Sequence, residues 1–285
     1  MSTPTLTATP TEAPFLPGGE DDLVKLDPDH PGFRDAHYRR RRNEIARMAF
    51  EYREGQPLPT VEYSEVEQQV WRTAWEHLAP LHAQRACREY LVCSEVVRLN
   101  RQRVPQLAEV NEVLMRATGF RMLPVAGLVT DRAFMGRLGQ GIFLSTQYMR
   151  HPSTPLYTPE PDVVHELVGH AAQLSHPGFA ELNRVFGSAA QRATEEQLRG
   201  IARVYWYTVE FGVVKENGTP KAYGAGLLSS FGELGRFLTD ATHVPLDFER
   251  MAATAYDPTR YQDLLFYADS YDELLRAVTG WLARF

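Results

Sequence analysis

The sequence has few cysteines, no long apolar run and no excess of basic residues. Its 285 residues include two cysteines, Cys87 and Cys93, whose spacing suits neither a disulfide framework nor a zinc knuckle. We interpret both as buried thiols in a protein of the reducing cytosol. No apolar stretch reaches the roughly 18 residues of a membrane span. A net charge of -6 gives no reason to expect a nucleic-acid partner. We therefore expect a cytoplasmic protein that binds neither membranes nor nucleic acid.

The N-terminal residues, MSTPTLTATPTEAPFLPGG, lack the charged start and the apolar core of a secretion signal. Because they are rich in threonine and proline, we predict a disordered tail over residues 1–22. The remaining chain shows no internal repeat and no second block of distinct composition. The predicted organisation is therefore a single domain over residues 23–285.

Apolar periodicity indicates a largely helical chain. Helices are predicted over about residues 38–53, 64–79, 87–97, 105–118, 161–174, 178–190, 195–215 and 271–283. Two of these starts, Thr194 to Gln197 and Ser270 to Glu273, have the spacing of a capping box. Two extended segments, FRMLPVAGLV and GIFLSTQ, are separated by a stretch that Gly136, Gly139 and Gly141 break. The predicted fold class is mainly α with a small β-sheet.

The most informative stretch is YTPEPDVVHELVGH, which contains two histidines five residues apart, His165 and His170. A zinc-protease helix uses a spacing of four, which places both imidazoles on one face. Five residues at about 100° each separate the side chains by about 140° on an ideal helix. The two rings can share one metal ion only if the helix is distorted between them, and Gly169 is a candidate position for the distortion.

A carboxylate in an apolar run is the second feature of interest. Glu210 lies in RVYWYTVEFGVV, and acidic side chains are almost never buried unless they are paired or bound to a metal. Two histidines and one carboxylate form the facial triad that suits non-haem Fe(II) and leaves coordination positions open. From the residues alone, ordinary buried or surface histidines remain the alternative to a mononuclear metal site.

Several long motifs resemble the biopterin-dependent aromatic amino-acid hydroxylases. They are YTPEPDVVHELVGH, YWYTVEFG and KAYGAGLLSSFGE, preceded by DHPGFRD, REGQPLPTVEYSEVE, CREY, PQL and TGFRMLPVAGL. The resemblance covers about residues 26 to 280 and implies the catalytic-domain fold of that family. YWYTVEFG, KAYGAG and SSFGE are closest to the members that act on phenylalanine.

The resemblance implies roles for individual residues. His165, His170 and Glu210 match the iron ligands, and Glu166 and Tyr205 are the candidate catalytic residues. Arg150 matches the arginine that holds the substrate carboxylate, and Asp162 matches the carboxylate that supports it. The other implied substrate contacts are Thr158, Pro161, Trp206, Phe211, Gly226 and Ser229. The implied pterin contacts are Gly127, Leu128, Val129, Phe134 and Glu166.

The resemblance therefore predicts a monooxygenase that uses Fe(II), a tetrahydropterin such as tetrahydrobiopterin, and O₂. We expect it to hydroxylate the ring of L-phenylalanine, giving L-tyrosine. Meta-hydroxylation, and tyrosine or tryptophan as substrate, are alternatives. A zinc metallohydrolase and an inactive binding protein are more remote alternatives.

Two departures from the family pattern concern the pockets. Where the family usually reads HVPL, this chain reads His170, Ala171, Ala172 and Gln173, so an amide is expected near the substrate ring or pointing away from it. Asp131 and Ala133 differ from the common pattern in the pterin loop. Few residues precede Asp27 and no coiled-coil tail follows, so we expect a monomer without activation by its substrate.

Overall fold

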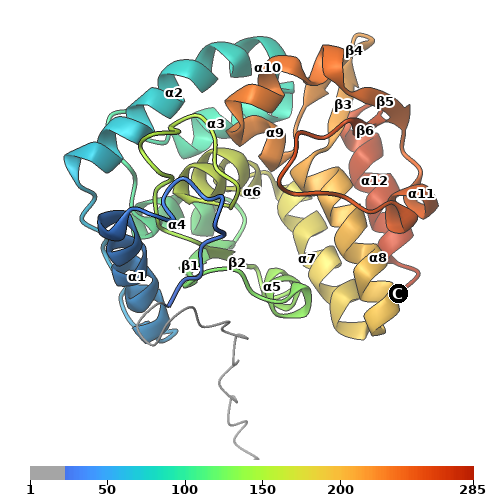
Figure 1. Ribbon diagram of the computed structural model, residues 1–285. Coiled ribbons are helices and arrows are strands. Elements are labelled where there is room, and N and C mark those ends of the chain that lie inside the picture. Colours follow the sequence, from blue (N-terminus) through green and yellow to red (C-terminus); the bar gives the residue numbers. More distant parts are fainter. Residues whose placement is uncertain (1–22) are drawn as a thin grey trace, which may run out of the picture.

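The computed structural model describes residues 23–285, so the predicted N-terminal tail lies outside the described residues. The helices from the two halves of the chain form two groups, and the short helix α6 (Ala172–Leu174) lies between them (Figure 1). In the first half of the chain the helices are α1 (Ala36–Glu51), α2 (Glu65–Arg85), α3 (Arg88–Val97), α4 (Leu107–Ala117) and α5 (Asp131–Leu138). The second half contains the π-helices η1 (His165–Ala171) and η2 (Trp206–Glu210), and the α-helices α6 (Ala172–Leu174), α7 (Pro177–Arg192), α8 (Glu195–Tyr205), α9 (Ala225–Ser229), α10 (Phe231–Asp240), α11 (Phe248–Ala253) and α12 (Tyr271–Leu282).

The strands form two small sheets rather than one. The parallel pair consists of β1 (Arg121–Pro124) and β2 (Ile142–Ser145), with Arg121 opposite Ile142. The second sheet has the order β4-β3-β6-β5 and contains β3 (Val213–Glu216), β4 (Thr219–Ala222), β5 (Thr242–Pro245) and β6 (Leu264–Ala268). The predicted class, mainly α with little β-structure, is confirmed.

Local sequence explains most helix starts. Ser64 and Thr194 form complete capping boxes with Glu67 and Gln197, so the box predicted at Thr194 is confirmed. The box predicted at Ser270 is only half formed. Ser270 accepts the backbone N–H of Glu273, but the Glu273 carboxylate accepts the N–H of Asp269 instead of that of Ser270.

The sequence prediction placed the end of one helix wrongly and missed another helix. The helix expected to run to residue 215 ends at Glu210, and the chain then forms the β3–β4 hairpin around Asn217 and Gly218, which both have positive φ. An Asn-Gly pair between extended residues is a strong hairpin signal. The glycine-broken stretch before β2 contains α5, which Thr130 caps. A Cβ on Gly187 would lie 2.1 Å from the Gly139 nitrogen, so these glycines allow α7 to pack closely on the end of α5.

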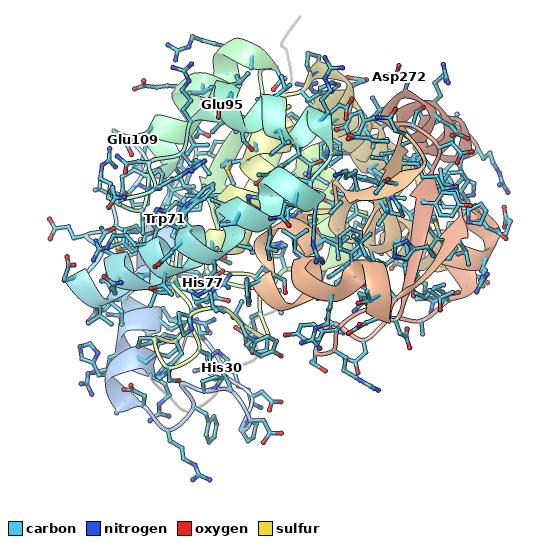
Figure 2. The ribbon with its side chains drawn as sticks, turned by 90° about the horizontal axis from the view of Figure 1, so that it is seen from above. His30, Trp71, His77, Glu95, Glu109 and Asp272 are labelled. Atoms are coloured by element: carbon cyan, nitrogen blue, oxygen red, sulfur yellow. The ribbon has the colours of Figure 1, made fainter. Side chains whose placement is uncertain are left out.

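One continuous cluster of buried side chains extends from Val70 to Leu282 and joins both halves of the described chain. Trp71 on α2 is fully buried, and its indole N–H donates to the Asn100 carbonyl oxygen at 2.8 Å (Figure 2). The same helix continues past Pro80, and Leu78 and His82 on either side of this proline are both buried. Among the described residues, none of the helices has the length and apolar composition to cross a bilayer.

His82 makes stability depend on pH. Its Nε2 lies 2.7 Å from the Leu228 carbonyl oxygen in α9, so the bond requires an N–H there. Burial lowers the pKa of His82 to about 4, against a weaker opposing effect of that hydrogen bond. The unfolded chain takes up a proton below about pH 6.5, whereas the folded chain does so only near pH 4, so acid favours unfolding in this window.

We predict that His82→Gln removes this part of the acid sensitivity. Between pH 7 and pH 4.5, the free energy of unfolding of the unsubstituted protein should fall by about 2 kcal/mol more than that of the variant. Urea unfolding at a series of pH values measures the difference. His37→Gln, at an exposed position on α1, is the matched control and should retain the original slope. Parallel curves for the protein and His82→Gln would contradict the prediction.

Candidate functional site

The two histidines lie on a π-helix. Residues His165 to Ala171 form η1, in which the backbone hydrogen bonds skip five residues rather than four. A spacing of five therefore returns the chain to the same face, as the predicted distortion requires. The distortion extends over all seven residues instead of centring on Gly169. Gly169 has another role, because a Cβ there would lie 2.7 Å from the Ala225 carbonyl oxygen, where α9 packs on η1.

Two side chains hold carbonyl groups of this π-helix. The Tyr90 hydroxyl donates to the Val168 carbonyl oxygen at 3.0 Å, and Gln173 Nε2 donates to that of Gly169 at 3.2 Å. Gln173 is buried and does not line the large cavity beside the histidines. Its amide therefore points away from that cavity, which is one of the two orientations that the sequence left open.

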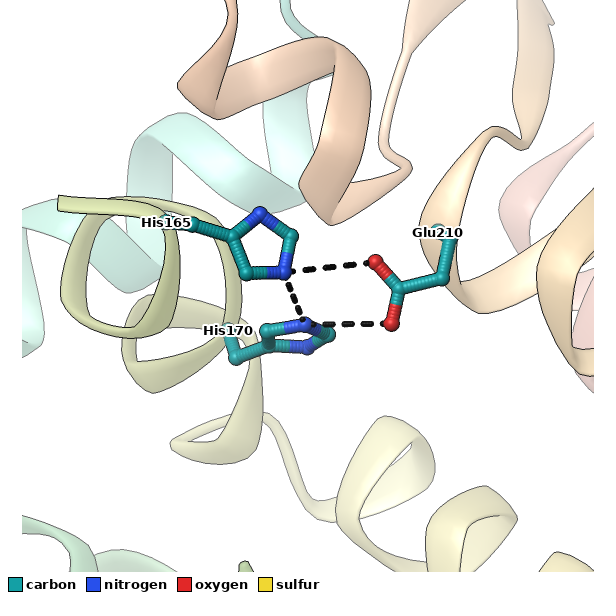
Figure 3. Close-up of side chains that lie close together, drawn as sticks. All are labelled: His165, His170 and Glu210. Atoms are coloured by element: carbon teal, nitrogen blue, oxygen red, sulfur yellow. Dashed lines mark hydrogen bonds and ion pairs between the residues drawn. The ribbon is translucent and has the colours of Figure 1, made fainter. Parts of the chain in front are cut away.

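The carboxylate of Glu210 meets both imidazoles (Figure 3). Glu210 is the last residue of η2, the π-helix that follows α8 directly. Its Oε1 lies 3.2 Å from His170 Nε2, its Oε2 lies 3.5 Å from His165 Nε2, and the two Nε2 atoms are 3.0 Å apart. The three side chains thus present one potential ligand atom each to a common point, within 4.8 Å of one another.

This donor set fits a divalent transition-metal ion. Bonds of about 2 Å to nitrogen and oxygen place neighbouring ligand atoms roughly 3 Å apart. The hydrogen bonds of Ser229 also select the tautomer of His165 whose Nε2 is free to bind a metal ion. Ser229 Oγ donates to the Ala225 carbonyl oxygen at 2.7 Å, so it accepts from His165 Nδ1, 2.9 Å away. The lone pair of His165 then resides on Nε2 and faces the common point.

The electrostatics of the three residues favour neutral His165 beside an ionised carboxylate. Burial lowers the pKa of His165 to about 4, although Glu210 opposes this. Burial raises the pKa of Glu210, but both imidazoles, His170 above all, lower it by more. For His170 the effect of burial is outweighed by Glu210, which raises its pKa. A bound cation would compete with protons for the same ligand atoms.

A cavity of about 420 Å³ opens beside these three side chains. Every residue for which the sequence predicted a metal, catalytic, substrate or pterin role lines it, except Asp162. Asp162 is fully buried and holds Arg150, whose Nε and Nη2 donate to its two oxygens at 2.9 and 2.7 Å. Arg150 in turn lowers the pKa of Asp162, against the effect of burial.

Aromatic rings form much of the cavity wall. The Trp206 ring stacks on Tyr256 with centroids 4.1 Å apart and an interplanar angle of 7°, and it lies 4.6 Å from the Phe211 ring. On the α5 side, the Phe134 ring meets Tyr205 edge to face at 5.9 Å. The Tyr205 hydroxyl is 3.4 Å from Asn183 Oδ1 and so is directed toward α7.

Glu166 is a buried carboxylate on the cavity wall. Its Oε1 accepts hydrogen bonds of 3.0 Å from both the backbone N–H and the hydroxyl of Thr146. Burial raises the pKa of Glu166 to about 7, although the nearby His170 and the Thr146 hydrogen bonds oppose this. The Glu166 carboxyl group therefore keeps its proton to a higher pH than an exposed glutamate does.

Sequence reasoning missed one wall of the cavity. Tyr256, the segment 258–261 and Glu233 all line it, and none had been selected. Glu233 lies within the motif SSFGE, so an acidic residue in an otherwise apolar and small run was the available signal. The segment 258–261 carries no comparable pattern, because only tertiary packing brings it to the cavity.

Ser229→Ala tests whether this hydroxyl orients the His165 ligand. We predict that the variant binds Fe(II) roughly 10- to 100-fold more weakly, because the imidazole loses the acceptor that fixes its Nδ1–H. Anaerobic titration with Fe(II), followed by metal analysis of the desalted protein, measures the affinity. Ser94→Ala is the matched control, since the Ser94 hydroxyl only donates to the Tyr90 carbonyl oxygen. Equal affinities for the unsubstituted protein and Ser229→Ala would refute the assigned role.

Comparison with known proteins adds independent evidence. Residues 21–285 match the family described as biopterin-dependent aromatic amino acid hydroxylase. Rat phenylalanine-4-hydroxylase is 44% identical over 265 residues, which are 91% of this chain and 58% of the rat protein. Tyrosine 3-monooxygenase of Drosophila melanogaster is 41% identical, over 95% of this chain and 50% of that protein. This chain thus spans between half and two-thirds of the length of these relatives.

A solved structure shows the same architecture. Chromobacterium violaceum phenylalanine hydroxylase, with bound iron(III) and 7,8-dihydrobiopterin, superposes with a TM-score of 0.76 at 33% identity. The match covers 84% of this chain and 90% of that one. The predicted catalytic-domain fold is therefore confirmed. The chain belongs to the family of biopterin-dependent aromatic amino acid hydroxylases.

Proposed function

We propose that this chain hydroxylates the aromatic ring of L-phenylalanine with O₂, giving L-tyrosine, and that it uses Fe(II) and a tetrahydropterin. The observation that carries the proposal is the convergence of His165, His170 and Glu210 beside an aromatic-lined cavity that also contains Arg150. When bound, the ferrous ion and the reduced pterin supply the oxygen chemistry and the electrons. The protein holds and orients the reactants and keeps water out.

Arg150 is the proposed anchor for the substrate carboxylate. Its Nε and Nη2 edge is occupied by Asp162, while no hydrogen bond within the described residues uses Nη1. The remaining guanidinium edge suits a carboxylate, which accepts two parallel hydrogen bonds from an arginine. Thr158, Gly226 and Ser229 line the same cavity as Arg150 and are proposed to surround the amino-acid end.

The substrate ring is proposed to lie against Trp206, Phe211 and Pro161. Trp206 is held on both sides, because its ring stacks on Tyr256 and its Nε1–H donates to Gln262 Oε1 at 3.0 Å. Phe134, the backbone of Gly127 to Val129 and Glu166 are proposed to receive the pterin. Flat, rigid walls of this kind restrict how a ring can rotate beside the metal ligands.

Para attack is the favoured outcome. The substitution of Ala172 and Gln173 for residues usual in the family was the reason to consider meta attack. Neither residue lines the cavity, so their replacement does not alter its lining. Tyrosine is the second candidate substrate, because a tyrosine 3-monooxygenase is 41% identical to this chain.

The proposed compartment is the cytosol, and two buried thiols support it. Cys87 and Cys93 are both unpaired and buried, as expected in a reducing environment. Monomeric behaviour remains a prediction.

Reconstitution with Fe(II) tests the proposed reaction. Anaerobically loaded protein is mixed with a tetrahydropterin, exposed to air and supplied separately with phenylalanine, tyrosine or tryptophan. We expect L-tyrosine as the main product from phenylalanine when the products are separated by ring position. Glu210→Ala, which lacks one metal ligand, is the negative control. Absence of oxidation of every aromatic amino acid would defeat the proposal, and retained activity in Glu210→Ala would defeat the ligand assignment.

Arg150→Lys tests the carboxylate anchor. We expect the KM for phenylalanine to rise roughly 10- to 100-fold, because a lysine cannot form the paired hydrogen bonds, while iron content stays unchanged. Lysine is preferred to alanine because alanine would leave the buried Asp162 without its cation. Steady-state kinetics and metal analysis give the two readouts. Arg121→Lys, in an exposed pair with Glu54, is the control, and an unchanged KM in Arg150→Lys would exclude this role.

A further inference from the structure

Glu233 is a cavity-lining carboxylate that the proposed function leaves without a role. It lies in the first turn of α10, and only 8% of its surface is exposed. Its Oε1 accepts the backbone N–H of Gln262 at 2.8 Å. No cationic side chain among residues 23–285 forms an ion pair with it. The nearby Arg236 instead pairs with Asp240 and lies over the Tyr261 ring.

The other acidic groups of the cavity are accounted for. Glu210 faces the two imidazoles, and Glu160 pairs with Arg42 at 2.8 Å. Glu166 takes two hydrogen bonds from Thr146, and Asp131 is exposed. Glu233 thus differs from them, because it is buried, has one carboxylate oxygen without a hydrogen bond within the described chain, and borders the cavity.

Glu233 is linked to the proposed amino-acid end of the cavity. Arg150 binds Asp162, Asp162 accepts the backbone N–H of His165, and the His165 ring bonds Ser229. Ser230 follows at once and caps the helix that carries Glu233. Tyr157, the neighbour of Thr158, lines the same cavity as Glu233.

A buried acidic side chain is stable as an anion only with a partner. Burial raises the pKa of Glu233 to about 7, although the hydrogen bond from Gln262 and the charge of Arg236 oppose this. An incoming cation would favour the ionised form. The substrate proposed above carries one, since an α-amino acid at neutral pH is a zwitterion whose ammonium group has three N–H donors.

We propose that Glu233 accepts the α-ammonium group of the amino-acid substrate, while Arg150 holds its carboxylate. This inference rests on the proposed function and specifies how the site selects an amino acid over other aromatic acids. Arg150 and Asp162 together are neutral, so Glu233 supplies the negative charge that the ammonium group needs. An aromatic acid without the amino group would leave Glu233 unpaired and would bind less well.

Glu233 also has a structural contact that the test must separate from substrate binding. The Glu233 carboxylate accepts the backbone N–H of Gln262, and the Gln262 side chain accepts the indole N–H of Trp206. Glu233 therefore also helps to position Trp206. Glu233→Gln keeps an oxygen that can accept the Gln262 N–H and removes only the charge. Asp240→Asn, at the exposed end of the same helix, is the matched control for a charge lost from α10.

The test measures binding rather than turnover. Fe(II)-loaded protein is titrated calorimetrically under anaerobic conditions with L-phenylalanine and with 3-phenylpropanoate, which lacks the amino group. The unsubstituted protein and Asp240→Asn should bind L-phenylalanine roughly 10- to 100-fold more tightly than 3-phenylpropanoate. In Glu233→Gln this preference should largely disappear, because the affinity for L-phenylalanine falls while that for 3-phenylpropanoate is retained or rises.

Other outcomes overturn the inference in distinguishable ways. Unchanged affinities in Glu233→Gln, or an equal loss for both ligands, would show that Glu233 acts only through Gln262 or not at all. If the variant does not fold, equal affinities of the two ligands for the unsubstituted protein still overturn the inference. A protein that binds no aromatic amino acid at any concentration refutes the proposed function itself.

Discussion

The structure of the site depends on one distortion of the backbone. Two histidines five residues apart would diverge on an α-helix, and the π-helix from His165 to Ala171 returns them to one face. Glu210 completes the group from a second π-helix, at the end of α8. Both irregular helices therefore place the atoms proposed to bind the metal, and an ordinary α-helix at either position would move one of them away from the common point.

Irregular backbone persists only where the surrounding structure supports it. Here the support comes from a residue just after the helix and from distant segments of the chain. Tyr90 and Gln173 hold two carbonyl groups of the first π-helix, and α9 packs on it where Gly169 lacks a side chain. The same α9 supplies Ser229, which fixes the imidazole form of His165. The packing that stabilises the distortion thus also sets the protonation state that the ligand needs.

The charged and aromatic groups around the cavity correspond to the parts of the proposed substrate. The buried Arg150 and Asp162 form a neutral pair, and Arg150 lines the cavity. Glu233 adds a separate buried carboxyl group on α10, and stacked rings at Trp206 and Tyr256 provide an apolar wall. Each feature has a distinct physical task, so the metal ligands, the charged anchors and the ring-binding wall can be tested independently.

The sequence by itself determined the donor set, the need for a distorted helix between His165 and His170, and the mainly helical class. These follow from residue type and local spacing, which act over a few residues. The tertiary structure decided that the distortion is a π-helix rather than a kink at Gly169, that Gln173 points away from the cavity, and that α8 gives way to a hairpin after Glu210. It also decided that Glu233 and the segment 258–261 border the site. Most of these features depend on contacts between residues far apart in the chain, of which local periodicity carries no record, whereas the Asn217-Gly218 pair is a local signal for the hairpin.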